Sequence, residues 1–262
     1  MDILENLSPS QKEELFKQLK VSWTYTSNAI EGNTLSLGDT AFVIEYGLTV
    51  KGKPLQDHND IIGHAVAIDL VYELIKQNSI TKEDVFSLHK AVQTAIIIDI
   101  DRPIGDYKVE ENGRYLNINN KATYLPYPMP KSIPYLMGLF FKEFGDTSKP
   151  LTTFDECVQS YTDMHIAFSS IHPFFDGNGR LARLIANIPL LKNGFLPIII
   201  SNEDRQEYIE LLSTYNLNAP KLNSTSISLV EKNSDYDRLL VFFKDQYKNS
   251  QILLDELRNS RR

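Results

Sequence analysis

The twelve residues from His172 to Arg183 constrain the fold of this chain more than any other stretch. They read His-Pro-Phe-Phe-Asp-Gly-Asn-Gly-Arg-Leu-Ala-Arg. Because a proline disfavours helical backbone for the residue before it, a helix that arrives from the N-terminal side should end at His172. The Gly-Asn-Gly segment suits a turn, and the apolar residues after it begin a new helical pattern. The sequence therefore predicts a helix, a short polar loop and a second, buried helix.

The same loop gathers groups that bind phosphates. The backbone N–H groups around Gly177, Asn178 and Gly179 can point into one concavity, an anion-binding nest. The helix that starts there aims its positive end at the same place. Arg180 and Arg183 lie three residues apart, so both leave the helix on one face and can hold phosphate groups.

Two further side chains of the loop supply chemistry. Asp176 is placed to bind Mg²⁺, which would bridge phosphate oxygens. His172 stands at the entrance of the loop and can take a proton from an attacking hydroxyl. The loop holds no Ser or Cys nucleophile, so the combination favours phosphoryl or nucleotidyl transfer over acyl transfer. A plain turn is the alternative, but a turn needs neither the His, the Asp nor two spaced arginines.

Composition limits the partners and the compartment. The 262 residues carry a net charge of −7, so no nucleic-acid partner is expected. No stretch approaches the roughly 18 apolar residues of a membrane span, so no membrane partner is expected either. Cys157 is the single cysteine, which fits a reducing compartment, and the first six residues lack the apolar run of a signal peptide. A cytoplasmic location is therefore expected.

Helical patterns dominate the rest of the chain, which predicts a mainly α fold. Capping boxes at Ser8 and Thr153 and a capping residue at Thr81 mark three helix starts. Apolar and polar residues alternate over Tyr115–Lys121 before a turn signal, which predicts one short β-hairpin between Tyr107 and Tyr124. Further helices are expected from Ser36, over Asp60–Lys76, over Ser132–Phe144, from the loop to Asn193 with a kink at Pro189, over Asn202–Leu217, and over Asp235–Arg258.

The loop resembles the signature of the Fic (filamentation-induced-by-cAMP) family, His-x-Phe-x-(Asp/Glu)-Gly-Asn-Gly-Arg-x-x-Arg, and matches all eight fixed positions. The resemblance extends from roughly Ser22 to Tyr215 and includes the Leu190–Pro197 run and the hairpin. It implies a Fic-type helical bundle with a short β-hairpin flap. It also implies a protein adenylyltransferase, which transfers AMP from ATP to a Ser, Thr or Tyr hydroxyl of a target protein or of the enzyme itself.

The resemblance assigns a role to each residue that matches the motif. His172 would deprotonate the target hydroxyl, Asp176 would hold Mg²⁺ and Phe174 would anchor the loop. Gly177, Asn178 and Gly179 would form the anion hole, with Arg180 on the β-phosphate side and Arg183 on the γ-phosphate. The hairpin resembles the flap that aligns a target segment by strand addition, so Leu116, Ile118 and Tyr124 are its docking candidates.

A second motif, Ser27–Asn33, resembles the inhibitory signature (Ser/Thr)-x-x-x-Glu-(Gly/Asn) of the same family. Its Glu31 would pair with Arg183 and block placement of the γ-phosphate, because a carboxylate satisfies the guanidinium and repels the nucleotide. Its position is that of the class whose inhibitory helix precedes the Fic core. We divide the chain accordingly into an inhibitory segment of the same domain (1–35), the Fic core (36–218) and a C-terminal loop and helix (219–262).

Several alternatives remain open at the level of sequence. Glu31 could orient water and remove AMP from a modified target, the donor could be another nucleotide or phosphate compound, or the domain could only sense nucleotides. A hydrolytic metal site from His165, His172 and Asp176 would leave the nest and both arginines without a role. Only about 40 residues follow Asn218, too few for a helix-turn-helix domain. The pattern does not decide whether the chain forms a homodimer.

Overall fold

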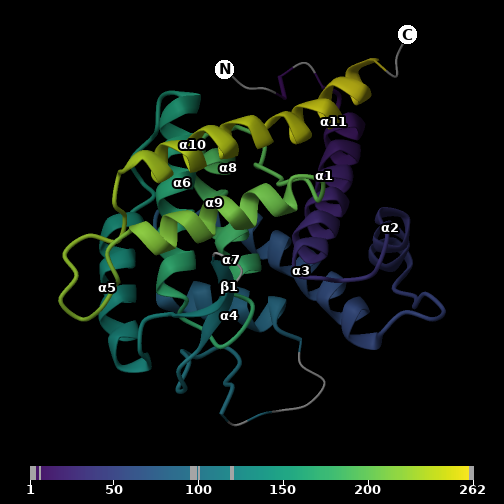
Figure 1. Ribbon diagram of the computed structural model, residues 1–262. Helices are drawn as coiled ribbons and strands as arrows, with labels where there is room; N and C mark the ends of the chain where they lie inside the picture. The colour runs from purple at the N-terminus through teal and green to yellow at the C-terminus, as the bar shows by residue number, and fades with distance from the viewer. Residues whose placement is uncertain (1–3, 6, 95–98, 100, 119–120, 260–262) are drawn as a thin grey trace.

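The computed structural model describes residues 4–5, 7–94, 99, 101–118 and 121–259, and every structural statement below concerns these residues. They form a mainly helical body with one small sheet (Figure 1). The elements in chain order are α1 (Pro9–Ile30), α2 (Leu37–Tyr46), α3 (Leu55–Leu74), α4 (Lys82–Val92), β1 (Gly113–Ile118), β2 (Lys121–Pro126), the 3₁₀ helix η1 (Pro130–Ser132), α5 (Ile133–Phe144), α6 (Phe154–Ile171), α7 (Asn178–Ile185), α8 (Ile188–Lys192), α9 (Arg205–Asn218), α10 (Ser234–Gln246) and α11 (Lys248–Asn259).

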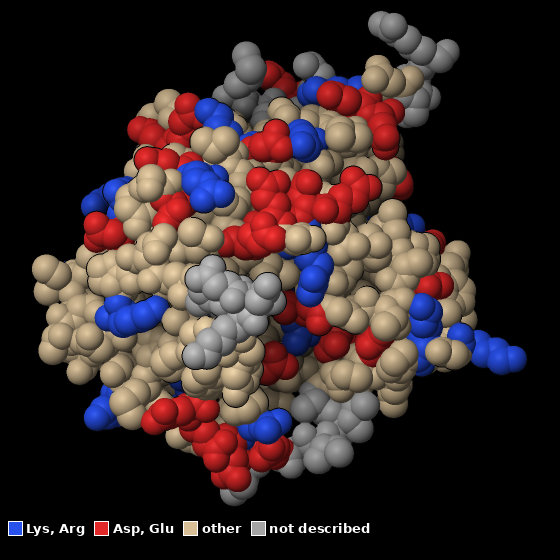
Figure 2. Space-filling model, in the orientation of Figure 1, with Lys and Arg blue, Asp and Glu red and all other residues tan. Residues whose placement is uncertain are grey.

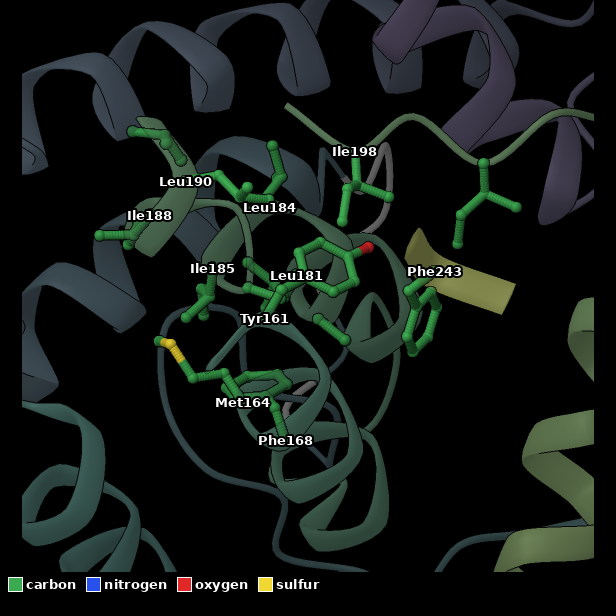
Figure 3. Packing of buried hydrophobic residues seen from close by; sticks show 14 of the residues in the cluster. Tyr161, Met164, Phe168, Leu181, Leu184, Ile185, Ile188, Leu190, Ile198 and Phe243 are labelled. Carbon is green, nitrogen blue, oxygen red and sulfur yellow. The ribbon is translucent and has the colours of Figure 1, made fainter. Parts of the chain in front are cut away.

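The centre of the body is built on α6 and α7, the two helices that flank the loop. Every residue of α7 except Gly179 is buried, and α7 contacts α1, α3, α4 and α6. Figure 3 shows apolar side chains of these helices packed together with Phe243 of α10. Burying each large apolar side chain contributes about 1.5–3 kcal/mol, so the loop between α6 and α7 is anchored on two helices that lie in the main hydrophobic core.

The predicted helix starts at Ser8, Thr81 and Thr153 are confirmed. In each case the side-chain oxygen of the capping residue accepts a hydrogen bond from the backbone N–H three residues later. The side chain of that later residue accepts a hydrogen bond from the backbone N–H of the capping residue. Ser36 caps α2 in the same way. These local signals are strong because a helix start must satisfy backbone donors that have no partner within the helix.

Two predicted helices are each interrupted. The helix after the loop does not continue to a kink at Pro189: α7 ends at Ile185 and α8 begins at Ile188. Buried Asn187 makes the break, because its side chain donates to the backbone oxygens of Arg183 and Ile198 and accepts from Ile198 N.

The prediction of one helix over Asp235–Arg258 was also wrong, because α10 and α11 meet at Tyr247. The Tyr247 hydroxyl accepts from Leu196 N, and Ser250 donates to Pro197 O. These bonds tie the junction to the segment that follows α8, so the chain bends there to stay on the body.

The predicted hairpin is present, and its second strand, β2, ends at Pro126, just past the expected limit at Tyr124. β1 and β2 pair antiparallel with Tyr115 opposite Tyr124, and the sheet runs from Gly113 to Pro126. The flap candidates Leu116 and Ile118 belong to β1 by their backbone, and the prediction for their side chains lies outside what the structure describes.

None of the helices within the described part of the chain has the length and apolar character needed to cross a membrane. Acidic and basic side chains both cover the face in Figure 2, and acidic ones gather over α9 and α10. Asp204, Glu207 and Asp237 line a shallow hollow between these two helices.

Candidate active site

His172 follows the last residue of α6 and has an unusual backbone. Its φ of 50° and ψ of 60° make it the one non-glycine residue in the left-handed region among those described. Such backbone is costly for a residue with a Cβ, and it typically persists where the surroundings require it. Here it ends the helix at the first residue of the loop.

One hydrogen bond sets the tautomer of His172. Nδ1 lies 3.3 Å from the backbone oxygen of Ser169, which can only accept. Nδ1 therefore carries the proton, and Nε2 keeps a lone pair. Burial, together with the positive charges of Lys108 and Arg114, lowers the pKa of His172 to about 3. The imidazole is consequently neutral at physiological pH and can accept a proton.

Asn178 holds the loop in shape rather than facing outward. Its Oδ1 accepts from Phe174 N and its Nδ2 donates to Phe174 O, both at 2.9 Å. The Phe174 ring is fully buried and stacks on His89 with 3.8 Å between centroids. The predicted anchoring role of Phe174 agrees with this geometry. Because both polar atoms of the Asn178 side chain are used, any contribution of Asn178 to an anion hole must come from its backbone.

A second brace comes from the segment before the hairpin, which the sequence did not indicate. Lys108 N donates to Pro173 O at 2.9 Å, and Asn112 Nδ2 donates to the backbone oxygens of Phe174 and Phe175 at 3.1 Å. Lys108 Nζ in turn donates to Asn112 Oδ1 at 2.6 Å. The loop is therefore held from two sides.

Asp176 is the exposed residue of the loop, with 67% of its side chain accessible. Its Oδ1 accepts from Gly177 N at 2.7 Å, and its Oδ2 accepts from Gln93 Nε2 at 3.3 Å. No group of three or more His, Cys, Asp or Glu side chains gathers in the described residues to hold a metal by itself. A cation at Asp176 would therefore need most of its ligands from a bound substrate and water.

Arg180 is held by protein groups. Its Nη1 lies 3.1 Å from Asp60 Oδ1 and donates to Val92 O at 3.3 Å. Its Nη2 donates to Gln93 Oε1 at 3.2 Å and lies 4.0 Å from Asp176 Oδ2. Sequence reasoning missed Asp60 and Gln93, which lie on and directly after helices far from the motif and carry no spacing signal.

Arg183 meets the second motif. Across 152 positions of sequence, its Nη2 donates to Glu31 Oε1 at 2.8 Å, so the predicted ion pair is present in the structure. Nη2 also donates to Ser27 O at 2.8 Å, and Nε donates to Ser27 Oγ at 3.0 Å. The first and fifth residues of the predicted motif thus bind the same guanidinium, of which 3% is accessible.

Tyr208 of α9 completes the surroundings of Arg183. Its hydroxyl accepts from Arg183 Nη1 at 3.4 Å and lies 3.0 Å from His165 Nε2. Burial, with Arg183 as a further cause, lowers the pKa of His165 to about 3, so His165 is neutral and its Nε2 accepts from the tyrosine. His165 therefore orients Arg183 through Tyr208, and among the described residues it belongs to no cluster of three or more potential metal ligands.

Glu31 also lies against the anion-binding turn. A Cβ at Gly179 would stand 2.5 Å from Glu31 Oε1 and 3.3 Å from Arg183 Nη1. Any larger residue at position 179 would force this carboxylate to move, so the glycine turn and the inhibitory motif occupy adjoining space. The end of α1 is fixed there by Arg205, whose Nε donates to Ile30 O at 2.7 Å.

Comparison with known proteins agrees with this geometry. Residues 79–190 match the family model described as Fic/DOC family. The chain contains a Fic/DOC domain. It is 32% identical over 207 residues to "Protein adenylyltransferase Fic" of Nematostella vectensis, an alignment that covers 78% of this chain and 44% of that protein. It is also 32% identical over 197 residues to "Protein adenylyltransferase fic-1" of Caenorhabditis elegans, covering 74% of this chain and 36% of that protein. The chain thus spans less than half the length of these relatives.

Solved structures share the fold. A Fic domain containing signaling protein from Bacteroides thetaiotaomicron aligns with a TM-score of 0.79 at 22% identity, over 98% of this chain and 93% of that chain. A fragment of Fic-1 from C. elegans aligns with a TM-score of 0.76 at 23% identity, over 98% of this chain and 69% of that chain. The predicted fold class, a mainly α Fic-type bundle with a short hairpin, is confirmed.

Proposed function

We propose that this protein is an autoinhibited adenylyltransferase, which transfers AMP from ATP to a hydroxyl of a protein and is restrained by Glu31. The observation that carries the proposal is the Glu31–Arg183 pair at 2.8 Å beside the glycine turn. The relatives named protein adenylyltransferase support the reaction class. The matched loop supports the same class, because it unites a neutral imidazole, a glycine turn and two guanidiniums.

The reaction needs one base and one site for negative charge. Nε2 of His172 would accept the proton of a Ser, Thr or Tyr hydroxyl while its oxygen attacks the α-phosphorus. The bond between the α-phosphorus and the bridging oxygen then breaks, and pyrophosphate leaves. Gly177 and Gly179 would stabilise the charge through backbone N–H groups at the start of α7.

Arg180 and Arg183 are proposed to face the β- and γ-phosphates. Arg183 is available only after Glu31 leaves, because the carboxylate uses Nη2. With Glu31 in place, a triphosphate would bring a second anion against the same guanidinium, at a site that burial makes sensitive to unpaired charge. Inhibition would therefore act on the placement of the γ-phosphate.

Asp176 fits a magnesium ion that a substrate brings with it. Mg²⁺ in phosphate-transfer sites is commonly bound by one or two carboxylates together with substrate phosphates and waters, and Asp176 is one such exposed carboxylate. When bound, the ion would neutralise phosphate charge and orient the phosphates. Asp176 itself would hold the ion, and its bonds to Gly177 and Gln93 would fix the carboxylate.

The proposal is tested by label transfer from ATP with Mg²⁺, using wild type, Glu31→Gly, and Glu31→Gly combined with His172→Ala. We expect label from the α-phosphate only, with transfer raised on the order of tenfold or more in Glu31→Gly and lost in the double variant. Label on the protein itself would identify self-modification. Label from the γ-phosphate would make the enzyme a kinase, and equal transfer by wild type and Glu31→Gly would contradict the inhibitory role.

His172→Ala separates the base from nucleotide binding. Because the imidazole takes a proton and holds no phosphate in this scheme, His172→Ala placed in the Glu31→Gly background should lose transfer yet bind ATP as Glu31→Gly alone does. Calorimetric titration with ATP measures this. Loss of ATP binding would mean that His172 shapes the loop instead of acting as a base.

Removal of AMP by the same site is a second candidate. Glu31 keeps 44% of its side chain accessible although it pairs with Arg183, so its carboxylate can also hold a water molecule. Such a water could attack the phosphorus of an AMP-modified hydroxyl. Release of AMP from a modified protein by wild type but not by Glu31→Gly would support this activity.

Further expectations from the sequence stand as proposals. We propose that residues 1–35 regulate the core formed by 36–218, and that 219–262 complete the bundle, since α10 contacts α6 and α9 and α11 contacts α1. A cytoplasmic location rests on the single cysteine. A homodimer stays a prediction.

A further inference from the structure

Tyr127, one residue past β2, covers His172. The two ring centroids are 3.5 Å apart and the ring planes differ by 5°, so the rings are stacked in parallel. Tyr127 N donates to Asn112 O at 3.0 Å, and Asn112 also binds the backbone oxygens of Phe174 and Phe175. The tyrosine is therefore tied to the loop that carries the histidine.

Two constraints together fix the imidazole. The bond from Nδ1 to Ser169 O holds one edge of the ring, and the tyrosine ring sets its plane. A base must present its lone pair to the attacking hydroxyl within a narrow range of angles. The hydrogen bond to α6 fixes Nδ1, and the Tyr127 ring fixes the plane of the imidazole. The lone pair of Nε2 therefore points in one direction.

A buried cation lies beside this pair. Lys108 Nζ is 5.7 Å from the centroid of the Tyr127 ring and is held by Asn112 Oδ1 at 2.6 Å. Lys108 is 2% exposed, and burial lowers its pKa to about 8, so it remains mostly protonated at pH 7.

The charged groups that act on His172 are Lys108 and Arg114 of β1, both positive. Burial raises the pKa of Tyr127; the positive charge of Arg114 opposes this shift and Glu31 adds to it, so the phenol is neutral. A positive neighbour disfavours the imidazolium and leaves the imidazole free to accept a proton.

We infer that Tyr127 and Lys108 are positioning residues for the proposed base: the Tyr127 ring holds the imidazole of His172 in the direction of attack, and the positive charge of Lys108 adds to the burial that keeps the imidazole unprotonated. The inference rests on the proposed function only where it concerns the effect of Tyr127 and Lys108 on the rate of AMP transfer. The stack and the charge also make predictions about the imidazole itself, which can be measured without any substrate.

The first experiment is an NMR titration of the full chain with labelled histidines, in wild type, Tyr127→Leu, Tyr127→Phe and Lys108→Met. His172→Gln identifies the His172 signal among the five histidines. In the wild type we expect His172 to stay neutral, with its proton on Nδ1, as the pH is lowered from 7 to below 5. Lys108→Met and Tyr127→Leu should each raise its midpoint by about one pH unit, the first by removing a like charge and the second by admitting water. Tyr127→Phe keeps the ring and should restore the wild-type midpoint.

The second experiment measures AMP transfer in the Glu31→Gly background. Tyr127→Leu should lower kcat on the order of tenfold while the KM for ATP stays the same, and Tyr127→Phe should recover most of the rate. In Lys108→Met the acid limb of the pH–rate profile should move to higher pH. Tyr46→Leu, at the exposed last residue of α2, is the matched control and should leave the His172 midpoint, kcat and KM unchanged.

The inference is overturned if the His172 midpoint is the same in wild type, Tyr127→Leu and Lys108→Met, or if Tyr127→Phe behaves as Tyr127→Leu does. If Glu31→Gly transfers no AMP, the proposed function fails, and the titration still decides the inference. If Tyr127→Leu does not fold, Lys108→Met against wild type decides it.

Discussion

Arg183 is the residue at which the parts of the site meet. Three of its nitrogens donate to groups from two separate helices: Ser27 and Glu31 at the C-terminal end of α1, and Tyr208 in α9. Since the guanidinium is buried, the removal of one partner leaves a donor unsatisfied at a cost of about 1–3 kcal/mol. The neighbours of Arg183 should therefore affect ATP binding as well as stability.

Tyr208→Phe tests this at the scale of one hydroxyl. In the Glu31→Gly background, we expect the Kd for ATP to rise several-fold, which is a loss of binding free energy on the order of 1 kcal/mol. The reason is that Arg183 Nη1 loses the hydroxyl to which it donates. Tyr215→Phe is a suitable control, since Tyr215 lies on the same helix, is 2% exposed, and accepts from Glu231 N. Both variants should lose similar stability, and only Tyr208→Phe should weaken ATP binding. Equal ATP affinity in the two variants would show that Tyr208 has a packing role alone.

At this scale the sequence predicted the loop and the Glu31–Arg183 pair because both are carried by compact motifs. It did not predict Tyr127, Tyr208 or Asp60 as neighbours of the site. Tyr208 meets His165 across 43 positions, and its own helix has only a weak amphipathic pattern. Contacts of this kind arise from how helices pack, and the residue types involved carry no spacing signal.

At the scale of elements, α9 restrains the inhibitory helix α1. Arg205, the first residue of α9, donates to Ile30 O at 2.7 Å and so binds one of the carbonyl groups that a helix end leaves without an internal partner. A positive charge at the C-terminal end of a helix also interacts favourably with the helix dipole. Glu31 follows directly, so this contact fixes the position of the inhibitory carboxylate.

Arg205→Ala should release part of the inhibition. In the otherwise wild-type chain we expect AMP transfer several-fold above wild type and below Glu31→Gly, because Glu31 remains but its backbone loses a tether worth about 1–2 kcal/mol. Label transfer from α-labelled ATP measures this. Arg238→Ala on α10 is the control, since 61% of its side chain is accessible and its ion pair lies within its own helix. A rise of the same size in both variants would point to general loosening, and no rise in either would remove Arg205 from the inhibitory mechanism.

Element starts were easier to predict than element breaks. The capping residues Ser8, Thr81 and Thr153 act on backbone groups within three positions, so the chain carries the whole signal locally. The breaks at Asn187 and Tyr247 depend on bonds to Ile198 and Leu196, which become neighbours only after the chain has folded. A periodic apolar pattern continues through such a break and does not report it.

For the whole molecule, buried neutral histidines make folding sensitive to acid. Burial lowers the pKa of His165 to about 3 and that of His89 to about 4, and it holds the pKa of His64 well below its usual range. In the unfolded chain the same side chains titrate near 6.5. Below about pH 6.5 these histidines bind protons in the unfolded state but stay neutral in the folded state. Their contribution to the free energy of unfolding is therefore fully present above about pH 6.5, and it is lost as the pH falls toward their folded-state pKa values.

We expect His165 and His89 each to lower the free energy of unfolding by about 2 kcal/mol between pH 7 and pH 5, and His64 to add to this loss. Urea unfolding of the full chain at the two pH values measures the total, and His165→Gln isolates one contribution. Glutamine keeps an acceptor for the Tyr208 hydroxyl but does not titrate, so the loss between pH 7 and pH 5 should be about 2 kcal/mol smaller in the variant. Carboxylates contribute equally to both proteins and cancel in the comparison. The same loss in wild type and variant would mean that His165 is charged or solvated in the folded protein, and that it cannot accept the hydrogen bond through which Tyr208 orients Arg183.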